Sequence, residues 1–85
     1  MYINLGQDTV IDTEDIIGIF DLDTATVSSR TRKFLAQSEK RGEVINVGYD
    51  LPKSFTVCYF PKTKQTRVYI SQISSNTLLK RWENP

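Results

Sequence analysis

The chain has 85 residues, of which 39% are apolar and 25% charged. A chain of this length can form one domain, which we expect to comprise residues 1–85. The composition excludes an intrinsically disordered chain. One cysteine and no histidine exclude an internal disulfide and disfavour a zinc site, so we expect no cofactor. A domain this small often gains stability from self-association, and we therefore expect a homo-oligomer.

The net charge of +1 conceals a strong asymmetry along the chain. Residues 1–23 carry six acids and no base, whereas residues 24–85 carry all eleven bases and four acids, a net charge of +7. This separation suits a subunit with two unlike faces, one for phosphates and one for a basic neighbour. The alternative is that the fold interleaves the two segments and cancels the field.

The start of the sequence gives no sign of a targeting segment. Residues 1–6 lack the basic and apolar regions of a signal peptide, and no apolar run approaches the ~20 residues of a membrane span. We therefore expect a cytoplasmic protein without a membrane partner.

Three short strands are predicted in the first 20 residues. Residues 2–5 and 9–11 are apolar-alternating runs separated by a turn at Gly6, which predicts a hairpin. Residues 16–20 form a β-branched run bounded by acids, and this pattern predicts a buried strand in which Gly18 permits the close approach of another backbone.

A helical period follows from Val27 to Arg41. One stripe of this helix comprises Val27, Thr31, Phe34, Leu35 and Ser38, and most of the basic side chains fall outside it. Thr26 and Ser28 are alternative N-caps, and Gly42 suits the first position after the helix.

The second half of the chain predicts three strands and a last helix. Residues 43–47 form the first strand, a loop runs from Gly48 to Lys53, and residues 54–60 and 66–71 form a hairpin. Ser74 is a good N-cap for a short C-terminal helix. The order β-β-β-α-β-β-β-α predicts an α+β domain, in which a small antiparallel sheet of about six strands packs on one amphipathic helix.

Catalytic chemistry finds no support in the sequence. Without histidine the commonest proton-shuttling side chain is missing, and the four glycines are isolated from one another. The acids Glu14 and Asp15 are interpreted as a solvated strand flank, and Cys58 as a buried, inert thiol. The sequence therefore predicts a protein that is not an enzyme.

Basic residues gather on the helix, in the loop and at the hairpin. The helix also carries Lys40 and Arg41 at its end. Candidate nucleic-acid-binding residues are Arg32, Lys33, Lys53, Lys62, Lys64 and Arg67. Each alone is compatible with ordinary solvated surface, but repetition around an oligomer would let the set follow phosphates. The apolar side of the last helix supplies candidate oligomer-interface residues: Leu78, Leu79 and Trp82.

Nearly the whole chain resembles the RemA/RemB family of bacterial extracellular-matrix regulatory proteins, most closely its RemB members. The resemblance is carried by residues 1–6 (MYINLG), by residues 12–21 (DTEDIIGIFD), by Phe34 and Leu35, and by the closing run that includes SSNTLLKR at 74–81. It implies a non-enzymatic regulator of extracellular-matrix genes in biofilms. RemA is a ring-forming protein that contacts the DNA backbone, so double-stranded DNA and a RemA-like protein are implied partners.

Two positions depart from the basic pattern of RemA. RemA places arginines in the loop before the penultimate hairpin, where residues 50–54 of this chain offer Lys53 alone as a base. A further arginine, at the start of the third strand, corresponds to Asp15, whose charge would repel a phosphate. The leading hypothesis is a RemB-like regulator with weak DNA-backbone binding. The alternative is a protein-interaction module that assembles with itself or a RemA-like partner without binding DNA.

Overall fold

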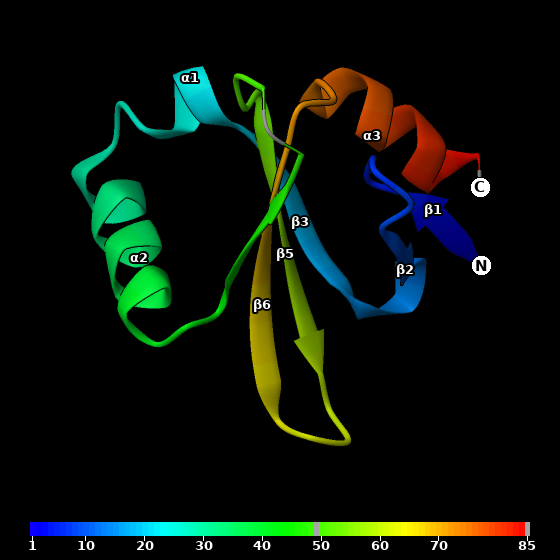
Figure 1. The fold of residues 1–85 in the computed structure, drawn as a ribbon, viewed down its shortest axis with the longest axis horizontal. Helices are drawn as coiled ribbons and strands as arrows, with labels where there is room; N and C mark the ends of the chain where they lie inside the picture. The colour runs from blue at the N-terminus through cyan, green and yellow to red at the C-terminus, as the bar shows by residue number, and fades with distance from the viewer. Residues whose placement is uncertain (49, 85) are drawn as a thin grey trace.

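The computed structural model describes residues 1–48 and 50–84. Tyr49, within the expected loop from Gly48 to Lys53, lies outside the described residues, as does Pro85. The elements, most of them labelled in Figure 1, are β1 (Tyr2–Asn4), β2 (Val10–Asp12), the 3-10 turn η1 (Thr13–Asp15), β3 (Ile16–Asp21), α1 (Leu22–Ala25), α2 (Ser29–Lys40), β4 (Val44–Val47), β5 (Ser54–Phe60), β6 (Gln65–Ser71) and α3 (Ser75–Glu83). The predicted α+β class is confirmed.

The strands form two sheets, which corrects the expectation of one antiparallel sheet. β1 pairs with β2, and the larger sheet has the order β3-β5-β6-β4. β4 runs parallel to β6, with Val44 opposite Val68 and Val47 opposite Ser71. Because β5 already pairs with β3 and β6 on its two sides, β4 joins the free side of β6 at the edge of the sheet.

The long predicted helix is confirmed as α2, with a later start. Ser28 occupies the N-cap position, and Gly42 follows the C-cap with a φ of 71°, in the left-handed region that glycine adopts without strain. Val27 was expected on the buried stripe, but it lies in the linker before the helix and is 79% exposed. Phe34 and Leu35 are half-buried, because α2 covers the sheet only partly.

Two short elements, η1 and α1, were not predicted from the sequence. Each begins after an aspartate whose carboxylate accepts a backbone hydrogen bond. Asp12 accepts from the Glu14 amide at 3.0 Å, and Asp21 accepts from the Thr24 amide at 3.0 Å. These contacts satisfy amides that have no partner inside the turn.

The two faces of the four-stranded sheet are covered by different parts of the chain (Figure 1). We call the first the α3 face, because α3 and the β1–β2 sheet pack against it. Its buried side chains are Ile3, Leu5, Ile11, Ile16, Ile19, Val47, Cys58, Tyr69 and Leu78. The second, the α2 face, is covered by α1 and α2 and buries Phe55, Val57 and Val68.

Polar contacts join the start of the chain to its end on the α3 face. The Ser71 hydroxyl donates to the Leu5 carbonyl at 2.6 Å and accepts from the Ile73 amide at 3.0 Å. Arg81 donates from Nη1 to the Asn4 carbonyl at 2.8 Å. Strand β1 is therefore held by the last strand and the last helix. Within residues 1–48 and 50–84, no helix has the length and apolar character needed to cross a membrane.

Candidate nucleic-acid interface

The predicted basic residues divide between the two ends of the large sheet. Lys53 directly precedes β5, whereas Lys62 and Lys64 lie in the turn that follows it. A strand of seven residues spans about 20 Å, so these lysines do not form one site. A continuous basic stripe would require several copies of the chain.

At the end of the large sheet where Lys53 lies, the Lys53 backbone is hydrogen-bonded and its side chain is exposed. The Lys53 amide donates to the Ser71 carbonyl at 2.8 Å, and its carbonyl accepts from the Leu22 amide at 3.0 Å. Lys53 is therefore presented on a fixed backbone beside α1. Its neighbours Leu51 and Pro52 are exposed and uncharged, which leaves Lys53 as the one cation among residues 51–53.

Arg32 and Lys33, in the first part of α2, have different surroundings. Arg32 donates from Nη1 to the carbonyls of Thr26 at 2.6 Å and Val27 at 2.9 Å. The Arg32 guanidinium therefore holds the segment between α1 and α2 against the start of α2. The sequence did not reveal this structural role. Lys33 is exposed and free to meet solvent or a ligand.

At the hairpin end, Arg67 projects from β6 on the α3 face. Its guanidinium carbon lies 5.8 Å from the centre of the Phe60 ring, a geometry that attracts the cation to the ring face. Lys62 and Lys64 are exposed in the turn, and Lys64 has a φ of 55°. The hairpin therefore carries three cations over a short stretch of chain.

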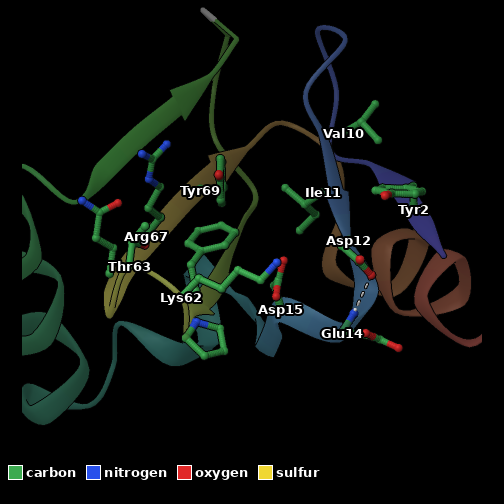
Figure 2. Close-up of a pocket in the computed structure, with 13 residues that line it drawn as sticks. Tyr2, Val10, Ile11, Asp12, Glu14, Asp15, Lys62, Thr63, Arg67 and Tyr69 are labelled. Atoms are coloured by element: carbon green, nitrogen blue, oxygen red, sulfur yellow. Dashed lines mark hydrogen bonds between the residues drawn. The ribbon is translucent and has the colours of Figure 1, made fainter.

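A wide groove of about 790 Å³ separates this hairpin from the β1–β2 sheet (Figure 2). One wall carries Asp12, Glu14 and Asp15, and the opposite wall carries Lys62 and Arg67. In Figure 2, Lys62 extends toward Asp15 across the groove. The remaining lining consists mostly of apolar and aromatic side chains, with two polar ones: Tyr2, Val10, Ile11, Phe60, Pro61, Tyr69, Thr63 and Gln65.

Asp15 gives this groove an acidic character next to the core. Cys58 is fully buried, and its pKa is raised to about 12, first by burial and then by the charge of Asp15. The prediction of a buried thiol is confirmed, and Cys58 stays protonated at neutral pH. The carboxylates of Asp12, Glu14 and Asp15 repel anions, so this acidic wall is unsuitable for phosphate.

A second depression, which we call the basic cleft, lies between the end of α2 and the hairpin. It has a volume of about 460 Å³ and brings together Arg41, Lys64 and Arg67 around one acid, Glu43. Arg41 donates from Nε to Glu43 Oε1 at 3.1 Å. The sequence indicated bases at both places, but it did not single out Arg41 as a binding residue, because only the β4–β6 pairing brings Arg41 to the hairpin.

Comparison with known proteins identifies the family. The RemA-like family, described as extracellular matrix regulatory protein A-like, matches residues 2–82. The chain belongs to the RemA-like family. It is 41% identical over 81 residues to extracellular matrix regulatory protein B of Bacillus subtilis (strain 168), an alignment that covers 95% of this chain and 89% of that protein. The predicted resemblance is confirmed.

The predicted interface residues of this RemA-like chain lie partly inside its own core. Leu78 is fully buried on the α3 face, so it offers no surface to a second subunit. Leu79 and Trp82 are half-buried against the same core. An oligomer interface on α3 stays a prediction, and of the three predicted residues only Leu79 and Trp82 have exposed surface that could contribute to it.

The RemA-like chain shows no metal-binding cluster in the part that the structure describes. No group of three or more acidic or cysteine side chains there lies close enough to hold an ion. The family's description is that of regulatory proteins, so the basic surfaces are the features of interest.

Proposed function

We propose that this RemA-like chain is a cytoplasmic, non-enzymatic regulator of extracellular-matrix genes, which acts as a homo-oligomer and binds the DNA backbone weakly. The observation that carries the proposal is the 41% identity to extracellular matrix regulatory protein B over 95% of the chain. An alignment of this extent includes every element that carries the basic residues. The proposal therefore extends the named role of that relative to this chain.

The arrangement of charge supports contact with DNA. Arg41, Lys62, Lys64 and Arg67 gather at the hairpin end, although the net charge of the chain is only +1. Each cation that neutralises a phosphate releases a counterion, so the affinity depends steeply on salt. One copy offers few such contacts, and an oligomer would multiply them.

Exposed apolar surface supports self-association. β3 is an edge strand, and its side chains Ile17 and Phe20 are 63% and 42% exposed. Tyr2, on the β1–β2 sheet, is 69% exposed. An edge strand with apolar exposed side chains favours pairing with another chain. Sedimentation at micromolar concentration is expected to show species larger than the 9.8 kDa monomer, and a monomer alone would contradict this part of the proposal.

Fluorescence anisotropy with a labelled DNA duplex tests the binding directly. We expect weak binding near 50 mM salt, with a log–log salt slope of about −0.9 for each phosphate contact. Lys53→Glu, which reverses the charge of one predicted DNA-binding residue, should weaken binding while the oligomer stays intact. Lys80→Glu, at an exposed position on α3, is the matched control. Absence of binding even at low salt would contradict the DNA part of the proposal.

The regulatory part is tested in the bacterium that carries the gene. Deletion is expected to change the transcript levels of the matrix genes, and the wild-type gene should restore them. Unchanged transcripts under biofilm-forming conditions would contradict the proposal.

A second candidate function is a protein-interaction module that does not bind DNA. The acidic wall of the wide groove favours it, because Asp12, Glu14 and Asp15 lie beside exposed Tyr2 and Val10. Such a groove suits a basic segment of a second copy or of a RemA-like partner. Complex formation with a RemA-like protein, together with no duplex binding at low salt, would favour this candidate.

A further inference from the structure

We propose that the basic cleft is a phosphate-binding site formed by Arg41, Lys64 and Arg67. This inference deepens the proposed function, because it names the chemical group that is bound and the residues that hold it. It rests on the proposed function only for the source of the phosphate, which is the backbone of DNA.

Three different elements supply the cations of the cleft. Arg41 is the C-cap of α2, Lys64 lies in the hairpin turn, and Arg67 lies on β6. The parallel pairing of β4 with β6 joins them, since the amide of Val68 donates to the carbonyl of Glu43 at 2.9 Å. Like charges held around one depression repel one another, so a bound anion would stabilise this arrangement.

The charge of the cleft matches a phosphate group. Three cations stand against one carboxylate, that of Glu43, which leaves a net charge of +2 on the lining. Arginine recognises phosphate through paired N–H groups, and lysine adds a compact positive charge. The cleft contains both kinds of cation, within a volume of about 460 Å³.

Contacts within the chain orient the two arginines. Arg41 uses Nε for the bond to Glu43 at 3.1 Å, and this bond leaves both terminal nitrogens for a ligand. The guanidinium carbon of Arg67 lies 5.8 Å from the centre of the Phe60 ring, which lines the wide groove, so this contact fixes Arg67 at the boundary between the two depressions. The amides of Arg41 and Gly42 already donate to the carbonyls of Gln37 and Glu39, each at 3.0 Å, so side chains rather than backbone would hold the anion.

Three of the other predicted binding residues are less suitable for this role. Arg32 donates to two carbonyls of the linker, and Lys53 is the one cation among residues 51–53. Lys62 faces the acidic wall of the wide groove (Figure 2). Arg67 and Gln65 border both depressions, whereas Asp15 lines only the wide groove, so a phosphate in the basic cleft would not lie among the acids of the groove.

A titration of the isotope-labelled chain with pyrophosphate, followed by amide NMR shifts, tests the site. Sodium chloride at matched ionic strength is the reference. We expect shifts in residues 41–45 and 64–67, and none in residues 30–33 or at Lys53. Shifts confined to other residues, or shifts that sodium chloride reproduces, would overturn the proposal.

Single substitutions test each cation. Arg41→Gln, Lys64→Asn and Arg67→Gln should each weaken pyrophosphate binding about fivefold, the effect of one unit charge at about 4 Å in water. Asparagine is chosen at Lys64 because it tolerates the positive φ of 55°. Lys80→Gln removes one charge from α3 and should change the affinity less than twofold. If the three cleft variants behave like Lys80→Gln, the site is wrong.

Glu43→Gln provides a test in the opposite direction. Removal of the one carboxylate from the lining should tighten pyrophosphate binding about fivefold. A purely structural role of Glu43 would not increase the affinity. Unchanged or weaker binding by this variant would contradict the electrostatic account of the cleft.

Duplex DNA distinguishes this inference from the proposed function. The salt slope for duplex binding should fall by about 0.9 for each cleft cation removed. If pyrophosphate binds in the cleft but no duplex binds at low salt, the cleft takes a soluble phosphate compound and the DNA-binding function fails. If the duplex binds with the same slope in all three variants and pyrophosphate shifts lie elsewhere, the cleft is wrong while the proposed function stands.

Discussion

The two faces of the large sheet differ in how completely they are closed. Over the described residues, nine buried side chains form the core of the α3 face and three form that of the α2 face. Within α2 the buried residue is Ser38, whose hydroxyl has no hydrogen-bond partner, whereas α3 buries Leu78 completely. We therefore expect stability to reside mainly on the α3 face, and α2 to be a more weakly held cover that carries charge.

The largest expected effect is that of Leu78→Ala on the α3 face. Loss of a fully buried leucine removes apolar contacts and leaves a cavity, which costs about 3–5 kcal/mol of the free energy of unfolding. Urea denaturation measures this loss. Leu79→Ala, at the half-buried neighbouring position, is the control and should cost less. A loss below about 1 kcal/mol for Leu78→Ala would show that the α3 face is not the main source of stability.

Phe34→Ala is the corresponding core substitution on the α2 face. Because Phe34 is half-buried, we expect a loss of about 2 kcal/mol, smaller than that of a fully enclosed phenylalanine. The same urea denaturation applies. A loss equal to that of Leu78→Ala would remove the distinction between the two faces.

The buried thiol of Cys58, in the core of the α3 face, should make the free energy of unfolding depend on pH. The thiol has a pKa of about 12 in the folded chain and an ordinary value of 9.0. Above pH 9 the unfolded chain loses this proton while the folded chain keeps it, so stability should fall by about 1.4 kcal/mol per pH unit up to pH 12. The variant Cys58→Ala lacks this contribution and is the control. Parallel stability curves of the two proteins between pH 8 and 10 would contradict the prediction.

The smallest effects are expected from the bases of α2. Arg32→Ala removes the contacts to the carbonyls of Thr26 and Val27 and should cost about 1 kcal/mol. Lys33→Ala removes an equal charge from an exposed position and should stay within about 0.5 kcal/mol of the wild type. Equal results in thermal denaturation would show that the guanidinium does not hold the linker.

Most of the fold was predictable from local sequence patterns. Short apolar or β-branched runs bounded by turn residues predicted all six strands, and Ser74 predicted the start of α3, where its hydroxyl accepts from the Thr77 amide at 3.3 Å. The short elements η1 and α1 were missed because three or four residues are too few to show a helical period. The carboxylates of Asp12 and Asp21 were the available signals, since aspartate is a favoured N-cap.

The arrangement of the sheet and the site could not be predicted in the same way. Pairing of β4 with β6 joins segments separated by all of β5, and no local pattern encodes such a contact. The basic cleft depends on that pairing, so Arg41 was not recognised beside Lys64 and Arg67. Lys53 was predicted in the right loop, but its distance from the hairpin became visible only with the fold.

The ties between strand β1 and helix α3 have a consequence for how the chain folds. Arg81 and Asn4, joined by the bond at 2.8 Å, are 77 positions apart. The α3 face therefore cannot close until residues 75–83, which form α3, have been synthesised. Until then α3 does not cover Ile3, Leu5 and Ile11, so these apolar side chains stay exposed on the nascent chain. Contacts of such long sequence separation slow folding, so we expect this small protein to fold more slowly than a helical bundle of equal length.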